Sequence, residues 1–220
     1  MPLKRTVIKV IALDFDGTLV ESNYIKDQAF ETIFSEWPEY RRSMMQWNLA
    51  RKSVGRREKF CYFVEEVLGQ RGNKKLINQL TDKFSELTRQ AIIDCPWVQG
   101  AQEFLEYFRG KLPFYLVSAT PQKELDEIIA KRDLKNIFKR TYGAPIDKIE
   151  VLEKIMSEEK SSPNQMLYIG DSPEDQQAAE SLEIDFIGRK SDRGLNGSGD
   201  TFFSEFEAIS AFVKKQYVLH

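Results

Sequence analysis

The 220-residue chain has almost no histidine and little cysteine. Its one histidine is His220, at the end of the chain, where we expect fraying. This argues against a Ser-His-Asp triad, a phosphohistidine intermediate and a histidine-rich zinc site. Neither Cys61 nor Cys95 has an arginine six positions later, as the phosphate loop of a cysteine phosphatase requires. Any catalysis must therefore depend on carboxylates, lysine, hydroxyl groups or a metal.

The sequence also lacks a strong net charge and a long apolar run. Lysine and arginine number 32 and aspartate and glutamate 34, a net charge of -2, so no basic field favours nucleic acid. No segment reaches the roughly 18 apolar residues of a membrane span. Met1 to Lys9 lacks the apolar run of a signal peptide, and the cysteines form no metal-type or redox-type pair. We therefore expect a soluble, cytoplasmic protein that binds neither nucleic acid nor a membrane.

Apolar runs separated by helical patterns predict an α/β fold. The segment from Thr6 to Leu13 is β-branched and apolar, which is typical of a buried strand. Further strands are expected at residues 114–119, 166–170 and 185–188. Helices are expected at residues 101–109, 121–131, 149–156 and about 202–214. Strands that alternate with helices indicate a parallel sheet with helices on both faces.

The stretch from about Glu21 to Asp94 interrupts this alternation. It contains no convincing strand, but apolar residues recur at helical spacing. The two stripes are Phe60, Phe63, Val64, Val67 and Leu68, and Leu76, Ile77, Leu80, Phe84, Leu87 and Ala91. We interpret residues 21–94 as an all-helical insertion, so that residues 1–20 and 95–220 form the sheet-containing domain. The segment from Ser191 to Asp200 is expected to be a mobile loop.

The strongest chemical signal is the acid pair Asp14 and Asp16, in the sequence DFDGT after the first strand. Residues two apart on a strand point to the same side, so we expect both carboxylates to project together, away from Phe15. Such a pair repels itself unless a cation or a proton intervenes. Gly17 permits a sharp turn of the backbone. Taken alone, the pair could instead be a helix N-cap or a solvated turn.

A second acidic cluster, GDSPED, follows the strand expected at 166–170. Asp171 then lies at the carboxyl end of a strand, where sites form in open parallel sheets. It can meet Asp14 across neighbouring strands, and carboxylates with a backbone carbonyl suit Mg²⁺. Asp175, one helical turn later, could hold a metal-bound water or another site residue. Ser172 by itself is consistent with a simple capping turn.

Two weaker signals complete the set. Ser118, Ala119 and Thr120 end the strand expected at 114–119, where a hydroxyl and free amides favour a phosphoryl oxygen. Thr120-Pro121 and Ser172-Pro173 each combine an N-cap hydroxyl with proline at the first helical position. Lys148 opens a predicted helix, where a cation is mildly unfavourable with the helix dipole. Such a lysine suggests an anionic partner.

In this order, DFDGTLVES, SAT, Lys148 and GDSPED resemble the four motifs of the haloacid dehalogenase superfamily, specifically its phosphatase branch. The resemblance covers essentially the whole chain and implies a Rossmann-like core with a mobile helical cap of the C1 type. It implies that Asp14 forms an aspartyl phosphate and that Asp16 is the acid/base. Mg²⁺ would be held by Asp14, the carbonyl of Asp16, and Asp171. The residues expected at the phosphoryl group are Thr18, Ser118, Ala119 and Lys148.

The resemblance favours a magnesium-dependent phosphatase that acts on a small phosphorylated metabolite. Ion-pumping ATPases of the superfamily carry threonine at the position of Asp16 and dehalogenases lack that acid, so a phosphate ester is favoured. The segment from Arg51 to Glu58 is similar to a cap loop of sugar-phosphate members, which makes Arg56 the expected substrate contact. Arg41, Arg42 and Arg57 could extend it or belong to a solvated helix face. A phosphomutase of the β-phosphoglucomutase type and a non-catalytic phosphate-binding module remain alternatives.

Overall fold

The computed structural model describes residues 6–51, 54–191, 195 and 199–219. His220, Lys52 and Ser53 of the expected cap loop, and most of the segment expected to be a mobile loop (Ser191 to Asp200) lie outside the described residues. The chain forms two compact units, Met1–Glu21 with Cys95–His220, and Ser22–Asp94. Among the described helices, none combines the length and the apolar character that a membrane crossing requires.

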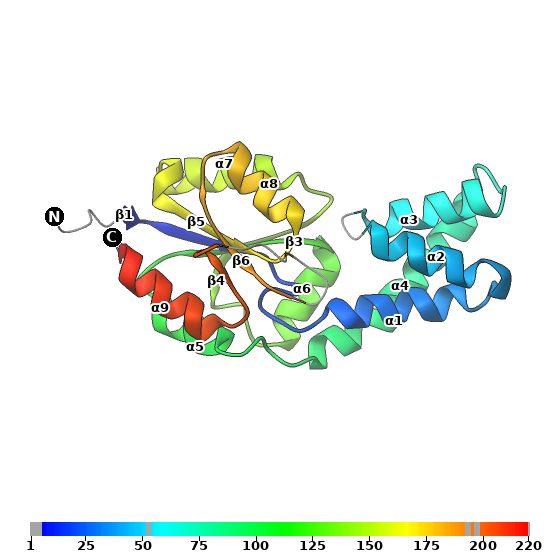
Figure 1. The fold of residues 1–220 in the computed structure, drawn as a ribbon, viewed down its shortest axis with the longest axis horizontal. Helices are drawn as coiled ribbons and strands as arrows, with labels where there is room; N and C mark the ends of the chain where they lie inside the picture. Colours follow the sequence, from blue (N-terminus) through cyan, green and yellow to red (C-terminus); the bar gives the residue numbers. More distant parts are fainter. Residues whose placement is uncertain (1–5, 52–53, 192–194, 196–198, 220) are drawn as a thin grey trace. The chain divides into compact units, whose positions relative to one another are not determined.

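The first unit is an α/β fold built on a parallel sheet (Figure 1). Its elements are β1 (Thr6–Ile8), β2 (Val10–Leu13), α5 (Ala101–Phe108), β3 (Phe114–Pro121), α6 (Gln122–Lys131), β4 (Phe138–Ala144), α7 (Lys148–Glu159), the 3₁₀ turn η2 (Pro163–Gln165), β5 (Met166–Gly170), α8 (Pro173–Ser181), β6 (Asp185–Arg189), β7 (Phe202–Phe203), α9 (Phe206–Gln216) and β8 (Tyr217–Leu219). Six strands run parallel in the order β4-β3-β2-β5-β6-β7. The predicted fold class is confirmed.

Helices cover both faces of this sheet (Figure 1). On one face, Val10, Tyr115 and Tyr168 pack with residues of α7 and α8 in one hydrophobic cluster. On the other face, the ring of Phe104 in α5 lies 6.1 Å from Phe114 of β3 and 5.1 Å from Phe206 of α9. Every residue of β2 is buried. Side chains that follow β2 therefore begin in a fully covered part of the sheet.

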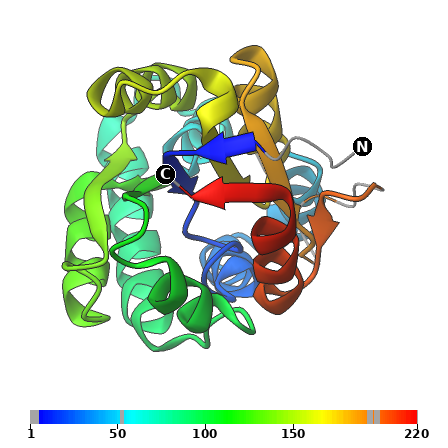
Figure 2. The same cartoon turned by 90° about the vertical axis from the view of Figure 1, so that its left-hand side faces the viewer.

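The first predicted strand is two strands. Lys9 separates β1 from β2, and its N–H donates to the carbonyl of Gln165 at 2.8 Å. β1 leaves the main sheet and pairs in parallel with β8 near the other end of the chain, as Figure 2 shows. The last predicted helix is also shorter, because residues 202–203 form β7 beside β6 and α9 begins only at Phe206.

The second unit, in its described residues, is helical throughout (Figure 1). Its elements are α1 (Asn23–Phe34), α2 (Pro38–Ala50), α3 (Arg56–Tyr62), the π-helical turn η1 (Phe63–Val67) and α4 (Lys74–Asp94). Both predicted stripes contribute to one core, but α4 buries Thr88 and Ile92 where Leu87 and Ala91 were expected. Leu87 is 39% exposed. In this part of α4, the buried positions are therefore displaced by one residue from the predicted stripe.

The two segments that join the units pair with each other on the α/β side. The N–H of Val98 donates to the carbonyl of Leu19 at 2.9 Å, and the N–H of Glu21 to the carbonyl of Pro96 at 3.0 Å. Val20 and Trp97 form an antiparallel bridge between these bonds. The chain therefore leaves and re-enters the α/β unit at neighbouring points.

Candidate active site

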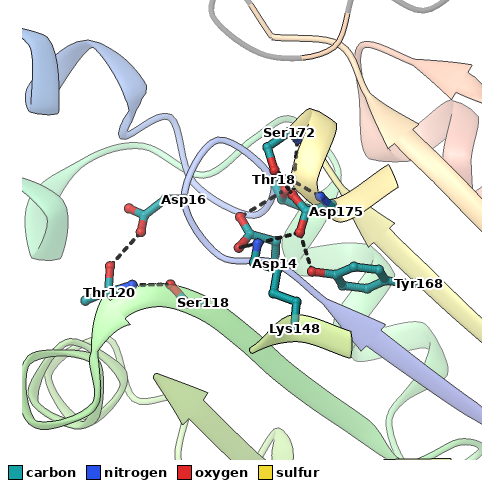
Figure 3. Close-up of polar contacts among 9 residues, drawn as sticks. All are labelled: Asp14, Asp16, Thr18, Ser118, Thr120, Lys148, Tyr168, Ser172 and Asp175. Atoms are coloured by element: carbon teal, nitrogen blue, oxygen red, sulfur yellow. Dashed lines mark hydrogen bonds and ion pairs between the residues drawn. The ribbon is translucent and has the colours of Figure 1, made fainter. Parts of the chain in front are cut away.

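The sequence-predicted residues of the α/β unit gather at the carboxyl ends of three neighbouring strands (Figure 3). Asp14 follows β2 in the middle, Asp171 follows β5 on one side, and Ser118 lies near the end of β3 on the other. All three side chains are buried. Parallel strands direct these residues to one edge of the sheet, because their carboxyl ends coincide.

The chain turns sharply directly after Asp14. The N–H of Asp14 still donates to the carbonyl of Ile169 at 2.9 Å, which extends the pairing of β2 with β5 by one bond. The carbonyl of Phe15 then accepts the N–H of Leu19 at 2.9 Å, and Gly17 has a φ of 78°. Such a left-handed turn favours glycine, since a side chain there is strained.

This turn separates the two acids that were expected to point together. β2 ends at Leu13, so strand alternation does not extend to Asp16. The carboxylate of Asp14 faces Lys148 and Asp175, whereas that of Asp16 reaches Thr120 in β3 (Figure 3). The two carboxylates therefore have different surroundings, although only one residue, Phe15, separates them in the sequence.

Three carboxylates form the anionic centre of the site. One oxygen each from Asp14, Asp171 and Asp175 lies within 4.8 Å of the others, and all three residues are buried. The pKa of Asp14 is raised well above its usual range, first by burial and then by the carboxylates of Asp175, Asp171 and Asp16, while Lys148 opposes the shift. A cluster of this kind favours a bound cation, and carboxylate oxygens are ligands that Mg²⁺ prefers.

Asp175 is hydrogen-bonded through both of its carboxylate oxygens. Its Oδ2 accepts the hydroxyl of Ser172 at 2.6 Å and the N–H of Ser172 at 3.1 Å, and its Oδ1 accepts from Tyr168 and from Lys148. Gly170 makes room for it, because a Cβ there would lie 2.5 Å from the Cβ of Asp175. Asp171, in turn, accepts the hydroxyl of Ser191 at 3.0 Å.

Ser172 caps α8 as its sequence predicts. Its hydroxyl accepts the N–H of Asp175 at 3.2 Å, and Pro173 occupies the first helical position. Because the side chain of Asp175 also reaches back to Ser172, the pair forms a capping box. The same two residues thus begin the helix and orient the carboxylate that holds Lys148.

Lys148 supplies a positive charge to this centre. It is the first residue of α7, after the N-cap Asp147. Its Nζ lies 2.5 Å from Oδ1 of Asp175 and 3.3 Å from Oδ1 of Asp14, with 16% of the side chain exposed. Burial alone would lower the pKa of the amine, but the carboxylates of Asp14 and Asp175 raise it well above its usual value. The ammonium therefore stays charged and adjacent to Asp14.

The hydroxyl residues of the site lie on both sides of Asp14. The Thr18 hydroxyl is 3.5 Å from Oδ2 of Asp14. The hydroxyl of Ser118 accepts the N–H of Thr120 at 3.1 Å, and Ala119 between them is exposed. The predicted helix start at Thr120 and Pro121 is wrong, because β3 continues through Pro121 and α6 begins at Gln122. The hydroxyl of Thr120 consequently caps no helix.

Comparison with known proteins agrees with this arrangement. The family model described as haloacid dehalogenase-like hydrolase matches residues 11–189. The chain belongs to the haloacid dehalogenase-like hydrolases. No significant match was found among curated protein sequences.

Solved structures of haloacid dehalogenase-like proteins share the fold. A predicted phosphoglycolate phosphatase from Haemophilus somnus superposes with a TM-score of 0.72 at 18% identity, over 94% of this chain and 98% of that one. CbbY from Rhodobacter sphaeroides, in complex with xylulose-(1,5)bisphosphate, gives 0.70 at 15% identity, over 90% and 95%. A predicted β-phosphoglucomutase from Thermotoga maritima gives 0.69 at 18% identity, over 94% and 99%.

Sequence reasoning missed two residues of this haloacid dehalogenase-like site. Burial and the carboxylate of Asp175 raise the pKa of Tyr168 far above its usual value, so its phenol stays protonated and can donate to Asp175. Arg189, buried at the end of β6, donates to the carbonyl of Gly17 at 3.0 Å and pairs with Glu21. The available signals were a tyrosine in the middle of the buried strand β5 and an arginine at the end of β6.

Arg56 belongs to the helical unit of the hydrolase. Its guanidinium lies 4.9 Å from the centre of the Phe84 ring and donates to the hydroxyl of Ser85 at 2.9 Å. It begins α3 directly after Gly55. Arg57, its neighbour, donates instead to the side chain of Asn78 at 2.8 Å. Within the unit, both arginines thus have contacts that link α3 to α4.

Proposed function

We propose that the protein is a magnesium-dependent phosphatase that hydrolyses a small phosphorylated metabolite. The observation that carries this proposal is the different setting of two buried acids on one turn. Asp14 lies in an anionic cluster beside the ammonium of Lys148, as a nucleophile that meets an anionic phosphoryl group requires. Asp16 lies apart from that cluster, beside the hydroxyl of Thr120, as an acid/base residue requires.

The chemistry follows from these positions. A carboxylate oxygen of Asp14 attacks phosphorus and forms an aspartyl phosphate, while the bond between phosphorus and the leaving oxygen breaks. Asp16 gives its proton to the leaving oxygen and later takes one from the water that hydrolyses the aspartyl phosphate. Hydrolysis frees the carboxylate of Asp14 and releases inorganic phosphate, and the proton taken from water restores Asp16, so both acids return to their starting states.

The remaining residues bind the phosphoryl group and the metal in this proposal. Asp14, the carbonyl of Asp16, and Asp171 would hold Mg²⁺, with Asp175 orienting Lys148 and Ser172. When bound, the ion supplies positive charge that offsets repulsion between the nucleophile and the phosphoryl oxygens. Those oxygens would be bound by Thr18, Ser118, the backbone of Ala119, and Lys148.

The helical unit is proposed to act as a cap that selects the substrate. A unit inserted directly after the turn that carries both acids is suited to close over a bound ester and exclude water. Arg56 is the proposed contact to the substrate. The resemblance of the segment from Arg51 to Glu58 to a cap loop of sugar-phosphate members supports this role.

The test is phosphate release from a panel of phosphate monoesters, with Mg²⁺ and after chelation. The panel includes phosphoglycolate and sugar phosphates, because the similar structures are named for such compounds. We expect metal-dependent release that falls by about 10³-fold or more in Asp14→Asn. Asp82→Asn, an exposed aspartate of α4, serves as the matched control and should retain full activity. Release that survives in Asp14→Asn would contradict the proposed nucleophile.

A phosphomutase is the second candidate, supported by the similarity to a predicted β-phosphoglucomutase. The same site would then return the phosphoryl group to another hydroxyl of the sugar. Phosphorus NMR of the products from hexose monophosphates separates the two functions. Inorganic phosphate indicates a phosphatase and an isomeric sugar phosphate indicates a mutase. Binding of Mg²⁺ and phosphate without either product would indicate a non-catalytic module.

A further inference from the structure

Thr120 occupies an unusual place among the buried hydroxyl residues of the α/β unit. It is 1% exposed, and its Oγ1 donates to Oδ2 of Asp16 at 2.8 Å, across 104 residues of sequence. Its N–H is held by the hydroxyl of Ser118 at 3.1 Å. Its hydroxyl and its backbone N–H are therefore both bound by residues of the site (Figure 3).

An irregularity in β3 places Thr120 there. The pairing of β3 with β4 is regular from Tyr115 to Val117 and resumes only at Pro121, with a register shift between Val117 and Pro121. Irregularities of this kind re-aim side chains and are frequent beside active sites. Here Ser118 and Thr120 are both buried while Ala119 is exposed.

The backbone that carries Thr120 is also packed tightly from the β4 side. A Cβ on Gly143 would lie 2.7 Å from the carbonyl oxygen of Thr120 and 2.6 Å from the Cα of Gln122. The N–H of Gly143 donates to the side chain of Gln122 at 2.6 Å. Since Thr120 is also β-branched and stiff at χ1, its hydroxyl has little freedom to leave Asp16.

We propose that Thr120 is a positioning residue that holds the carboxyl group of Asp16 toward the leaving oxygen of the substrate. The inference rests on the proposed function and adds a residue to it. A hydroxyl both donates and accepts, so the contact persists whether Asp16 carries its proton or has delivered it. A lysine or a backbone N–H in this place could only donate. The hydroxyl therefore suits a group that must give and regain a proton.

Dependence on the leaving group distinguishes positioning from a merely structural role. An alkoxide leaving group needs a proton as its bond to phosphorus breaks, whereas p-nitrophenolate leaves without one. A variant that misplaces Asp16 therefore slows alkyl esters selectively. A variant that disturbs the nucleophile or the metal slows both classes of ester equally.

The experiment compares Thr120→Val and Thr120→Ser with the native protein at saturating Mg²⁺. The measured quantity is kcat/KM, which includes departure of the leaving group, for the best alkyl ester of the panel and for p-nitrophenyl phosphate. In Thr120→Val we expect a loss of about 10 to 100-fold on the alkyl ester and less than about 3-fold on the aryl ester. Thr120→Ser should restore alkyl activity to within about 3-fold, because it keeps the hydroxyl.

Two controls complete the design. Thr141→Val removes a β4 hydroxyl that lies 3.4 Å from Asp126, away from both acids, and should change neither ester. In an Asp16→Asn background, Thr120→Val should cause no further loss on the alkyl ester, because there is no acid left to position. Thermal unfolding of each variant verifies folding.

Each outcome decides the inference. Equal losses on the two esters in Thr120→Val, or no loss on either, would overturn the positioning role while leaving the phosphatase intact. Additive losses in the Asp16→Asn background would also overturn it. If native protein releases phosphate from neither ester, the proposed function fails, and the role of Thr120 fails with it. If Thr120→Val does not fold, Thr120→Ser against Thr120→Ala gives the same comparison.

Discussion

The two units of the chain bury different kinds of side chain. In the α/β unit, the buried acids lie at one edge of the sheet, where Asp14, Asp171 and Asp175 face each other. In the helical unit, the core is a cluster of phenylalanines, with ring centroids as close as 4.5 Å between Phe30 and Phe84. The α/β unit therefore holds carboxylates that repel each other, whereas the helical unit holds aromatic rings that attract each other.

A lysine accompanies each arrangement, half-buried in the α/β unit and buried in the helical unit, and the surroundings of the two differ in the same sense. Lys148 faces two carboxylates, Asp14 and Asp175. Lys59, which is 4% exposed, donates to the side-chain carbonyl of Asn48 at 2.7 Å and lies 5.0 Å from the centre of the Phe30 ring. The first lysine lies between carboxylates, and the second lies against an amide carbonyl and an aromatic ring.

The largest effect is expected from removing Lys148. In Lys148→Met, two buried carboxylates lose their cation, which we expect to destabilise the α/β unit by about 3 to 5 kcal/mol. The pKa of Lys148 is raised on folding, so its contribution is present below the unfolded value of 10.5 and is lost only as the pH rises through the folded pKa. Denaturant unfolding of metal-free protein at pH 7 measures the loss. Combining it with Asp14→Asn should recover part of the stability, and failure to recover any would contradict the charge-based account.

In Phe84→Ala we expect a similar loss of folding stability, confined to the helical unit. The ring is 2% exposed and contacts Phe30, so its removal should cost about 3 to 5 kcal/mol through lost burial and a cavity. Hydrogen exchange followed by mass spectrometry should show weaker protection in α1 and α4 and unchanged protection in β5. Leu87→Ala, on the exposed side of α4, is the matched control, with an expected change below about 0.5 kcal/mol. Equal loss of protection in β5 would show that the two cores are not independent.

A smaller loss is expected for Lys59→Met. The methionine keeps most of the buried volume, but the side-chain carbonyl of Asn48 loses the donor from Lys59, which should cost about 1 to 3 kcal/mol. Denaturant unfolding at neutral pH measures the change. A loss as large as that of Lys148→Met would contradict this expectation of a smaller cost.

The smallest effect concerns thiol chemistry, because each unit holds one cysteine. Burial raises the pKa of Cys95 to about 11, with the carboxylate of Asp16 adding to the shift and Arg132 opposing it. At pH 8 only about one Cys95 thiol in 10³ is then ionised. We expect Cys61, half-buried on α3, to react with Ellman's reagent at least about 100-fold faster than Cys95.

The pH dependence and one variant check this assignment. Reaction of Cys95 in the folded protein should rise about tenfold per pH unit between pH 7 and 9.5, because the thiolate fraction rises in that way below the pKa. Cys61→Ser should abolish the fast phase and leave the slow one. A fast phase that survives in Cys61→Ser would place the accessible thiol in the α/β unit.

The fold was predictable where the sequence pattern is local. Strands that are largely buried appear in the sequence as short apolar runs. β3, β5 and β6 lie at the segments where such runs predicted them. β4 was missed because most of its residues are exposed or half-buried, so that the edge-strand sequence FKRTYGA contains no apolar run. The break at Lys9 was missed because it depends on pairing with β8, about two hundred residues later.

The residues of the site were predictable from motifs, but their directions were not. Nothing in DFDGT shows that the turn after β2 sends Asp16 to Thr120 instead of beside Asp14. That contact, and the one between Lys148 and Asp14, join residues more than 100 positions apart. Long-range contacts of this kind depend on strand order and on the shift in β3, which no local pattern encodes.

The hydrogen-bonded pair of connecting segments has a consequence for how such a protein can diversify. Because Glu21 and Pro96 are bonded neighbours, everything between them is topologically a hairpin loop that has grown into a domain. Lengthening, shortening or exchanging that loop breaks no strand of the sheet and adds little closure entropy. The position is therefore a natural insertion point, at which new specificity could be acquired while the hydrolytic machinery is inherited unchanged.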